Sequence, residues 1–255
     1  MLRVLFLLLI IFLPADYASA QNFAKNKNNL AISAPEKSLK IGEKLAYSLE
    51  ILGIPVGKIT LDTLSLEKIN GRDCYHITAR IFPNSYFIKF YDIEYKVDTY
   101  LDKVTFTTRR FIKMRRYRKN LTTTDIDFSQ KQIGLNDLKD LKVNQQAQDI
   151  LSALYNLRLK DIEENRTYTL DIFYSEKDWN FTFQIGKPQL KAIRKKGILS
   201  VFEVVIKSGL NRQILGEEGI TVILSADAKR IPLEFKFGTG MGTIKGRFID
   251  TPKNE

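Results

Sequence analysis

The sequence is poor in the two residues that most often build metal centres and cross-links. It contains one cysteine, Cys74, and one histidine, His76, in 255 residues. A single cysteine cannot form a disulfide within the chain, so stability must come from a packed core. The two residues lie two positions apart on one face of an expected strand, but a specific zinc site needs more ligands than this pair supplies. We predict neither a metal nor a cofactor.

Recognisable catalytic motifs are also missing. The chain has no glycine-rich phosphate loop and no dinucleotide-binding fingerprint. A catalytic triad would have to be built on His76. Acidic pairs occur at Asp92 with Glu94 and at Asp125 with Asp127, but such pairs are common on strands, and a glycosidase also needs a cleft. No catalytic residue is assigned, and a protein that is not an enzyme is favoured.

Long apolar runs are absent after the first residues. Arg3 precedes the apolar run Val4–Leu13, and the small residues Ala18 and Ala20 follow it. This order is typical of a secretory signal peptide, and the run is short for a membrane span. We predict a signal peptide at 1–20 that is cleaved after its last residue, with an uncleaved N-terminal anchor as the alternative. No cysteine follows the run to carry a lipid, and no later segment is apolar enough to cross a membrane.

Acidic residues are outnumbered by basic ones, 29 to 40, which gives a formal net charge of +11. Apolar residues make up 44% of the chain, as in folded proteins, so it can bury a core. A basic exported protein meets anionic lipid, lipopolysaccharide phosphates and acidic polymers, whereas nucleic acid is scarce there. We expect a periplasmic or secreted protein, or one peripheral to a membrane, whose partner is such an anion or another envelope protein, and no nucleic acid.

Alternation of apolar and polar residues predicts strands in both halves of the chain. The stretch "LAYSLEI" alternates from Leu45 to Ile51, and a change of parity after Thr63 predicts a bulge. The stretches 167–174 and 179–185 flank the turn residues "SEKD" and form the clearest hairpin. Further strands are predicted at 198–207, 219–226, 231–237 and 241–249. The fold class is therefore mostly β, with antiparallel twisted sheets or an incomplete barrel.

One segment predicts a helix, which we expect to pack on the sheet. In "DILSALYNLRL" apolar residues recur at spacings of three and four, and Asp149 can cap the first turn of a helix at 149–159. The polar run 136–148 before it is the best internal boundary. The predicted organisation is a flexible lead at 21–38, a β-rich domain at 39–249 that forms one unit or two halves at 39–135 and 149–249 joined by a polar linker, and a tail at 250–255.

Five residues are interpreted as architectural landmarks. In "LSADAKRIPLEF", Asp227 can bond the backbone of a turn, and Pro232 fits the first position of a strand. Gly42, Gly53 and Gly57 are interpreted as positions that need unusual backbone dihedrals.

The chain resembles a known family at several of these places. The segments "IGEKLAYSLEILGIPVGKITL", "YHI", "DILSALYNLR", "LSADAKRIPLEF" and "GTIKG" look like the successive landmarks of the bacterial exported-protein family called domain of unknown function 3108. The resemblance runs from about Leu39 to Phe248. It implies a secreted or periplasmic β-rich protein without an established activity. The style of fold is similar to periplasmic lipoprotein-sorting carriers, in which an incomplete barrel cups an apolar ligand under a helix.

Basic residues concentrate in "RRFIKMRRYRK", where seven of eleven residues are basic. These candidate anion- or lipid-binding residues are Arg109, Arg110, Lys113, Arg115, Arg116, Arg118 and Lys119. Neither face of such a strand is purely apolar, which suits an edge strand whose charges deter sheet-to-sheet pairing. Alternatively, the segment binds anionic headgroups or phosphates, with Phe111 and Tyr117 at the lipid interface.

Two classes of function follow. The first is a non-enzymatic envelope protein that binds an apolar or anionic ligand, or an envelope partner, through a β-cradle and a basic surface. The second is a carboxylate-dependent hydrolase of envelope polysaccharide or wall fragments. The first is favoured, because binding needs only the curved sheet and basic surface that the sequence predicts.

Overall fold

The structure is a computed structural model that describes most of the chain after residue 37. The described residues are 38–84, 86, 93–117, 119–129, 132–135, 138–142, 144–174, 177–208, 219–239 and 242–249. The predicted signal peptide at 1–20, nearly all of the lead at 21–38, the tail at 250–255 and Arg118 lie outside them. None of the helices in the described part of the chain has the length and apolar character of a membrane span.

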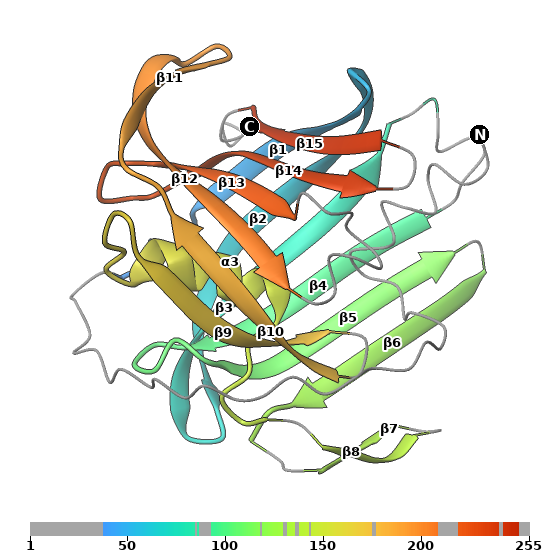
Figure 1. Cartoon of the computed structure of the whole chain (residues 1–255). Helices are drawn as coiled ribbons and strands as arrows, with labels where there is room; N and C mark the ends of the chain where they lie inside the picture. The colour runs from blue at the N-terminus through green and yellow to red at the C-terminus, as the bar shows by residue number, and fades with distance from the viewer. Residues whose placement is uncertain are drawn as a thin grey trace.

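Strands dominate the described chain (Figure 1). The first half forms β1 (Lys44–Ile51), β2 (Ile54–Ile69), β3 (Arg72–Pro83), β4 (Ile93–Asp102), β5 (Thr108–Tyr117), β6 (Asn120–Asp127), β7 (Gln132–Leu135) and β8 (Leu138–Lys142). The second half forms α3 (Ile150–Leu159), β9 (Thr167–Tyr174), β10 (Lys177–Ile185), β11 (Gln189–Ile193), β12 (Gly197–Ser208), β13 (Ile220–Ser225), β14 (Pro232–Thr239) and β15 (Gly242–Phe248).

The main sheet is antiparallel and curled, but not closed. Its strand order is β6-β5-β4-β3-β2-β1-β15-β14-β13-β12-β10-β9, with β11 added beside β12, while β7 and β8 form a separate pair. The end strands β6 and β9 do not pair with each other. The prediction of a mostly β, incomplete-barrel fold with one packed helix is therefore confirmed. Because β1 pairs with β15, residues from both predicted halves build a single sheet.

The sequence around the first hairpin explains its geometry. Leu52 and Gly53, with φ values of 51° and 81°, form the two-residue turn between β1 and β2. Gly57 lies inside β2 without a positive φ, so the expectation of an unusual dihedral there is wrong. It is needed for space, because a Cβ atom would lie 2.6 Å from the carbonyl oxygen of Phe82 on β3. The predicted bulge after Thr63 is present.

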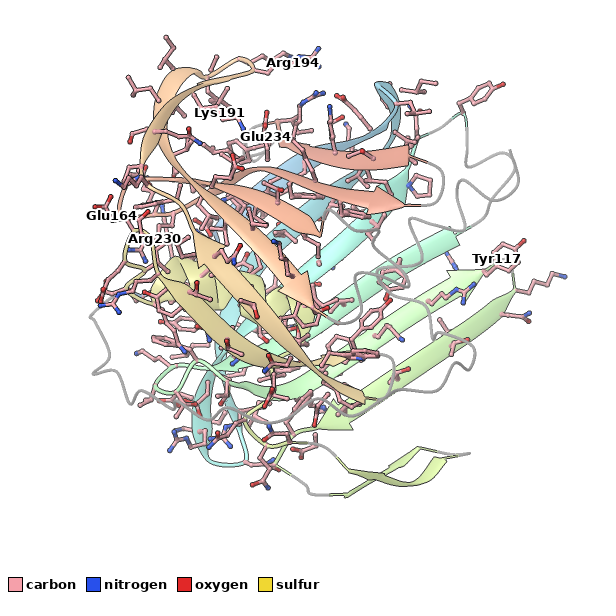
Figure 2. All side chains as sticks on the ribbon, viewed as in Figure 1. Tyr117, Glu164, Lys191, Arg194, Arg230 and Glu234 are labelled. Atoms are coloured by element: carbon pink, nitrogen blue, oxygen red, sulfur yellow. The ribbon has the colours of Figure 1, made fainter. Side chains whose placement is uncertain are left out.

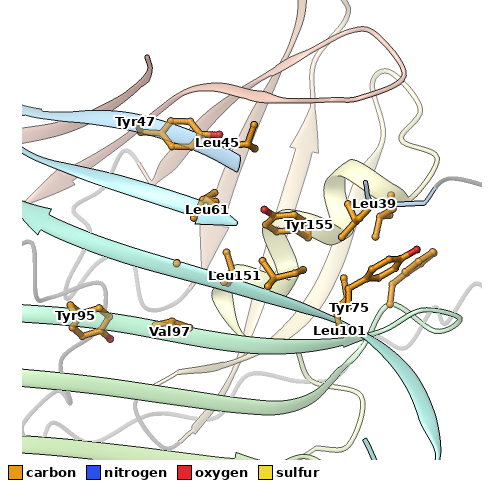
Figure 3. Packing of buried hydrophobic residues seen from close by; sticks show 14 residues of the cluster. Leu39, Leu45, Tyr47, Leu61, Tyr75, Tyr95, Val97, Leu101, Leu151 and Tyr155 are labelled. Atoms are coloured by element: carbon orange, nitrogen blue, oxygen red, sulfur yellow. The ribbon is translucent and has the colours of Figure 1, made fainter. Parts of the chain in front are cut away.

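Helix α3 lies against the face of the sheet that we call the inner face. Asp149 caps it by accepting hydrogen bonds from the backbone N–H groups of Leu151 and Ser152, as the sequence predicts. One side of α3 packs on β1 to β4, where Leu151 and Tyr155 join the largest buried cluster (Figure 3). The other side packs through Ala153 and Leu157 on β9, β10, β12 and β13. A helix buried on both sides holds the two walls of the open barrel together.

The polar run 136–148 is not a plain linker. It contains β8, and its last residue, Gln148, forms a parallel bridge to Ile172 on β9. Ala147 packs with Phe128 and Phe173 in a small buried cluster. Residues between β6 and α3 therefore attach to β9, one end of the open sheet.

The corner after β13 is organised by Asp227. Its carboxylate accepts hydrogen bonds from the Ser225 hydroxyl at 2.7 Å and from the backbone N–H groups of Lys229 and Arg230, both at 3.1 Å. Pro232 is the first residue of β14.

Gly42 lies two residues before β1 and has a φ of 82°. Its backbone N–H donates a hydrogen bond to the Thr63 carbonyl.

Candidate functional site

The basic strand β5 is paired on both sides. Its neighbours are β4 and β6, so the alternative that it is an edge strand is wrong. The edge position belongs to β6, which follows after a short turn containing Lys119, an exposed residue. Both faces of β5 carry basic residues for different reasons, because the outer and inner faces contact different parts of the protein.

The basic side chains on the outer face are matched by carboxylates. Arg110 donates two hydrogen bonds to Asp125 of β6, at 2.9 and 2.6 Å. Arg116 forms an ion pair of 2.7 Å with Glu94 of β4. At the start of the strand, Arg109 donates to the buried carboxylate of Asp102 at 3.0 Å. These arginines are engaged in cross-strand contacts.

The inner face of β5 carries Lys113 and Arg115. Lys113 lies opposite Val97, and Arg115 lies opposite Tyr95, on the side of β4 that belongs to the buried core. The Nε atom of Arg115 is buried, and no residue that the structure describes forms a hydrogen bond with it. In the described part of the chain, no carboxylate forms an ion pair with Arg115. An enclosed guanidinium N–H without an acceptor is costly, and an anionic ligand would satisfy it.

Two tyrosines from different walls accompany Arg115. Burial raises the pKa of Tyr95 far above its usual value, the nearby Tyr174 of β9 raises it further, and the positive charge of Arg115 lowers it. Tyr174 is itself buried. Side chains of β4, β5 and β9 are therefore within electrostatic range of one another at the inner face. We call Arg115, Tyr95 and Tyr174 the inner polar group.

Apolar side chains continue the inner face on β1, β2, β14 and β15. Leu49, Ile51, Val56, Phe237 and Ile244 form a buried cluster that contains no residue of α3. Partly buried side chains pack around it: Ile59, Ile81, Ile220 and Phe235. The inner face therefore combines a helix-covered region, an apolar region whose buried cluster contains no helix residue, and the inner polar group.

The pair Cys74 and His76 takes separate structural roles. Cys74 is buried, and burial raises the pKa of its thiol to about 11. His76 bridges Glu67 at 2.8 Å and Asp98 at 3.0 Å, and its ring stacks on Tyr100 with centroids 4.6 Å apart. The hydrogen bond to Asp98 raises the pKa of His76. Within the described residues, no group of three or more His, Cys, Asp or Glu side chains is arranged to hold a metal.

The acidic pairs that a hydrolase would use are engaged elsewhere. Asp125 is bound by Arg110. Asp127 accepts from the Asn70 amide at 3.0 Å and from the backbone N–H of Ser129 at 2.8 Å. Glu94 pairs with Arg116, and Asp92 lies outside the described residues. These contacts stabilise the β5–β6 part of the sheet.

Sequence reasoning selected Arg115 but did not connect it with Tyr95 and Tyr174. Alternation along β4 and β9 predicts the faces of these tyrosines. It does not predict that the ends of β4 and β9 approach each other across the interior. That information lies in the order of strands in the sheet.

The fold and the inner face define an open, barrel-like β protein with a helix in its interior. The chain belongs to the family described as Protein of unknown function (DUF3108), which matches residues 45–249. It is also similar in fold to a crystal structure of a β-barrel-like protein of domain of unknown function DUF1849 from Brucella abortus, with a TM-score of 0.52 and 12% identity over 83% of this chain and 97% of that chain. No curated protein matches the sequence.

Proposed function

We propose that this is a non-enzymatic, exported cell-envelope protein that binds an amphiphile with an apolar body and an anionic head on its inner face. The observation that carries the proposal is the buried Nε of Arg115, which has no acceptor among the described residues. A carboxylate or phosphate oxygen would supply that acceptor and a counter-charge. Arginine suits this task, because its planar fork binds such groups in a bidentate manner.

The neighbouring residues support an anionic head over a neutral one. Burial raises the pKa of Tyr95, so its hydroxyl group is protonated at neutral pH. A protonated hydroxyl can donate to the same oxygen atoms as Arg115. In a buried setting, each such bond to a charged acceptor is stronger than in water.

The apolar body of the ligand would lie on the partly buried side chains Ile59, Ile81, Ile220 and Phe235. Covering such side chains releases about 25 cal/mol per Å² of apolar surface, so an acyl chain gains affinity with length. Apolar lining with few placed polar groups is typical of sites for small molecules.

The location and the remaining partners belong to the same proposal. The predicted signal peptide at 1–20 supports export to the periplasm or beyond. The charge of +11 favours anionic lipid, lipopolysaccharide or an acidic polymer as the environment, and an envelope protein as a possible recipient of the ligand. Nucleic acid is not a partner in this proposal.

Native mass spectrometry of protein purified from its own envelope tests the proposal. We expect a co-purifying amphiphile in the wild type and its loss in Arg115→Gln. Arg116→Gln is the matched control, because Arg116 is the next residue on β5, points to the outer face and pairs with Glu94. An empty wild type, or equal ligand retention in the two variants, would refute the proposal.

A further inference from the structure

The hairpin of β11 and β12 has an outward face that nothing in the described chain covers. Cross-strand pairing places Ala192 opposite Ile198 and Leu190 opposite Ser200, so these four residues share a face. Leu190 is 76% exposed and Ile198 is 72% exposed. Two large aliphatic side chains that lie together on one short hairpin form an apolar patch, whereas a single exposed residue does not.

The other face of the hairpin fixes its position on the body of the protein. Ile193 and Val201 pack with Ile223 and Leu233 in a buried cluster. The hairpin is therefore held by its own core, and the outward face is presented by a rigid support. It does not need to reorganise in order to meet a partner.

The charge around the patch is of one sign. Between Lys187 and Phe202 the chain has five basic residues and no acidic residue. They are Lys187, Lys191, Arg194, Lys195 and Lys196. Arg194, Lys195 and Lys196 form the turn at the tip of the hairpin.

Carboxylates of the sheet offset only part of this charge. Lys191 lies 3.8 Å from Glu234, and Arg194 lies 3.6 Å from Glu50 while its side chain stays 69% exposed. Glu50 also accepts a hydrogen bond from Arg247. Figure 2 shows Lys191 and Glu234 on the body side of the hairpin and Arg194 at its tip.

We propose that the β11–β12 hairpin docks on the surface of an anionic lipid bilayer. Leu190 and Ile198 enter the boundary between headgroups and acyl chains, and Arg194 and Lys195 contact headgroup phosphates. An apolar patch beside clustered cations is the arrangement that binds such interfaces. A protein partner would be expected to need a larger apolar area than this short hairpin offers.

The proposal does not rest on the ligand site of the inner face. The exposed part of the hairpin is supported by the cluster of Ile193 and Val201 with Ile223 and Leu233, and none of its residues belongs to the inner polar group. The variant Arg115→Gln is therefore expected to bind vesicles as the wild type does, so the two proposals can fail separately.

A fluorescent label at the patch tests the docking directly. In Ile198→Cys the new thiol is exposed, whereas Cys74 is buried and its thiol pKa is raised to about 11, so labelling is selective. With an environment-sensitive dye we expect about a twofold rise in intensity on adding phosphatidylglycerol–phosphatidylcholine vesicles, and none with phosphatidylcholine alone. Leu121→Cys on β6, where the side chain is 59% exposed, is the control. An equal response at both sites, or none at position 198, would overturn the proposal.

Vesicle sedimentation separates the hairpin from general charge. Replacing Arg194 and Lys195 by Gln should weaken binding to the same anionic vesicles about thirtyfold, which is about fivefold for each lost cation near the surface. Replacing Arg110 and Arg116 by Gln removes the same charge from the outer face of β5 and should weaken it far less. Equal losses in the two double variants would mean that net charge alone drives binding. The N-terminal apolar run could by itself hold the chain on vesicles and hide a change in sedimentation. In that case the dye at position 198 still reports whether the hairpin inserts.

Discussion

The helix-covered half of the inner face and its β5–β6 side each contain an arginine, in opposite electrostatic settings. Arg158 of α3 donates two hydrogen bonds to Glu43, at 2.7 and 2.8 Å, and a third to the carbonyl of Lys229. Arg115 of β5 has a buried Nε without an acceptor and no ion pair within the described residues. The first arginine is completed by its own chain and serves stability. The second has no such partner among the described residues, and under our proposal a ligand supplies it.

The largest effect is expected where the chain completes the arginine. Arg158→Ala leaves Glu43 partly buried beside Tyr47 and Tyr155, and we expect the free energy of unfolding to fall by about 4 kcal/mol. Urea denaturation measures it. The exposed pair of Arg166 with Glu163 is the control, since Arg166→Ala should change the free energy of unfolding by less than about 0.5 kcal/mol. A similarly small change in the free energy of unfolding for Arg158→Ala would contradict the contrast drawn between Arg158 and Arg115.

Asp149 tests how much the buried hydrogen bonds of the helix-covered half stabilise the fold. Its carboxylate accepts from two backbone N–H groups and from the hydroxyls of Thr99 and Thr108. Burial raises its pKa, and these donors oppose the increase. Asp149→Ala leaves buried donors unpaired, so we expect a loss of about 3 kcal/mol in thermal or urea unfolding. Asp227→Ala, at an exposed turn with three comparable bonds, should cost about 1 kcal/mol. Equal losses would contradict the role of burial.

His76 offers a third cation, shared between two carboxylates on the outer face. Its folded-state pKa is raised, so its stabilising contribution is complete below the ordinary value of 6.5 and is lost as the pH rises through the raised value. We expect His76→Gln to be less stable than wild type by about 1 kcal/mol at acidic pH near 6, and the difference to shrink by pH 9. Urea unfolding across this range measures it. A difference that grows with pH would show that the neutral imidazole is the stabilising form.

The smallest effect on stability is expected at Arg115. Arg115→Gln removes a charge that has no ion-pair partner in the described part of the chain, so the free energy of unfolding should stay within about 1 kcal/mol of the wild type. Ligand retention should nevertheless be lost. A drop of more than about 2 kcal/mol in urea unfolding would show that Arg115 serves the fold, as Arg158 does.

Local features of this fold could be predicted from the sequence, and contacts between distant strands could not. Alternation from Leu45 to Ile51 gave the buried face of β1, and the spacing after Asp149 gave α3 with its cap. That Arg115 of β5 and Tyr174 of β9 both lie within electrostatic range of Tyr95 depends on strand order and on how far the sheet curls. The basic strand was expected at an edge because charge on both faces disfavours a central position. Its actual place beside β6 follows from carboxylates on β4 and β6 that match its outer arginines, and such matching is visible only once the register is known.

The pairing of β1 with β15 has a consequence for how the chain folds. Tyr47 and Phe248 are cross-strand partners whose rings lie 5.8 Å apart, although they come from opposite ends of the described chain. Strands β1 to β6 follow one another as neighbours and can pair as soon as each is made, whereas the joint at β1 waits for the last strand. Pairing across such a separation in sequence is slow, because the entropy cost of closing the loop comes before the favourable contacts form. Until β15 arrives, one edge of β1 stays open and α3 lacks part of its final surroundings, so we expect the joint between β1 and β15 to be the slow step of folding.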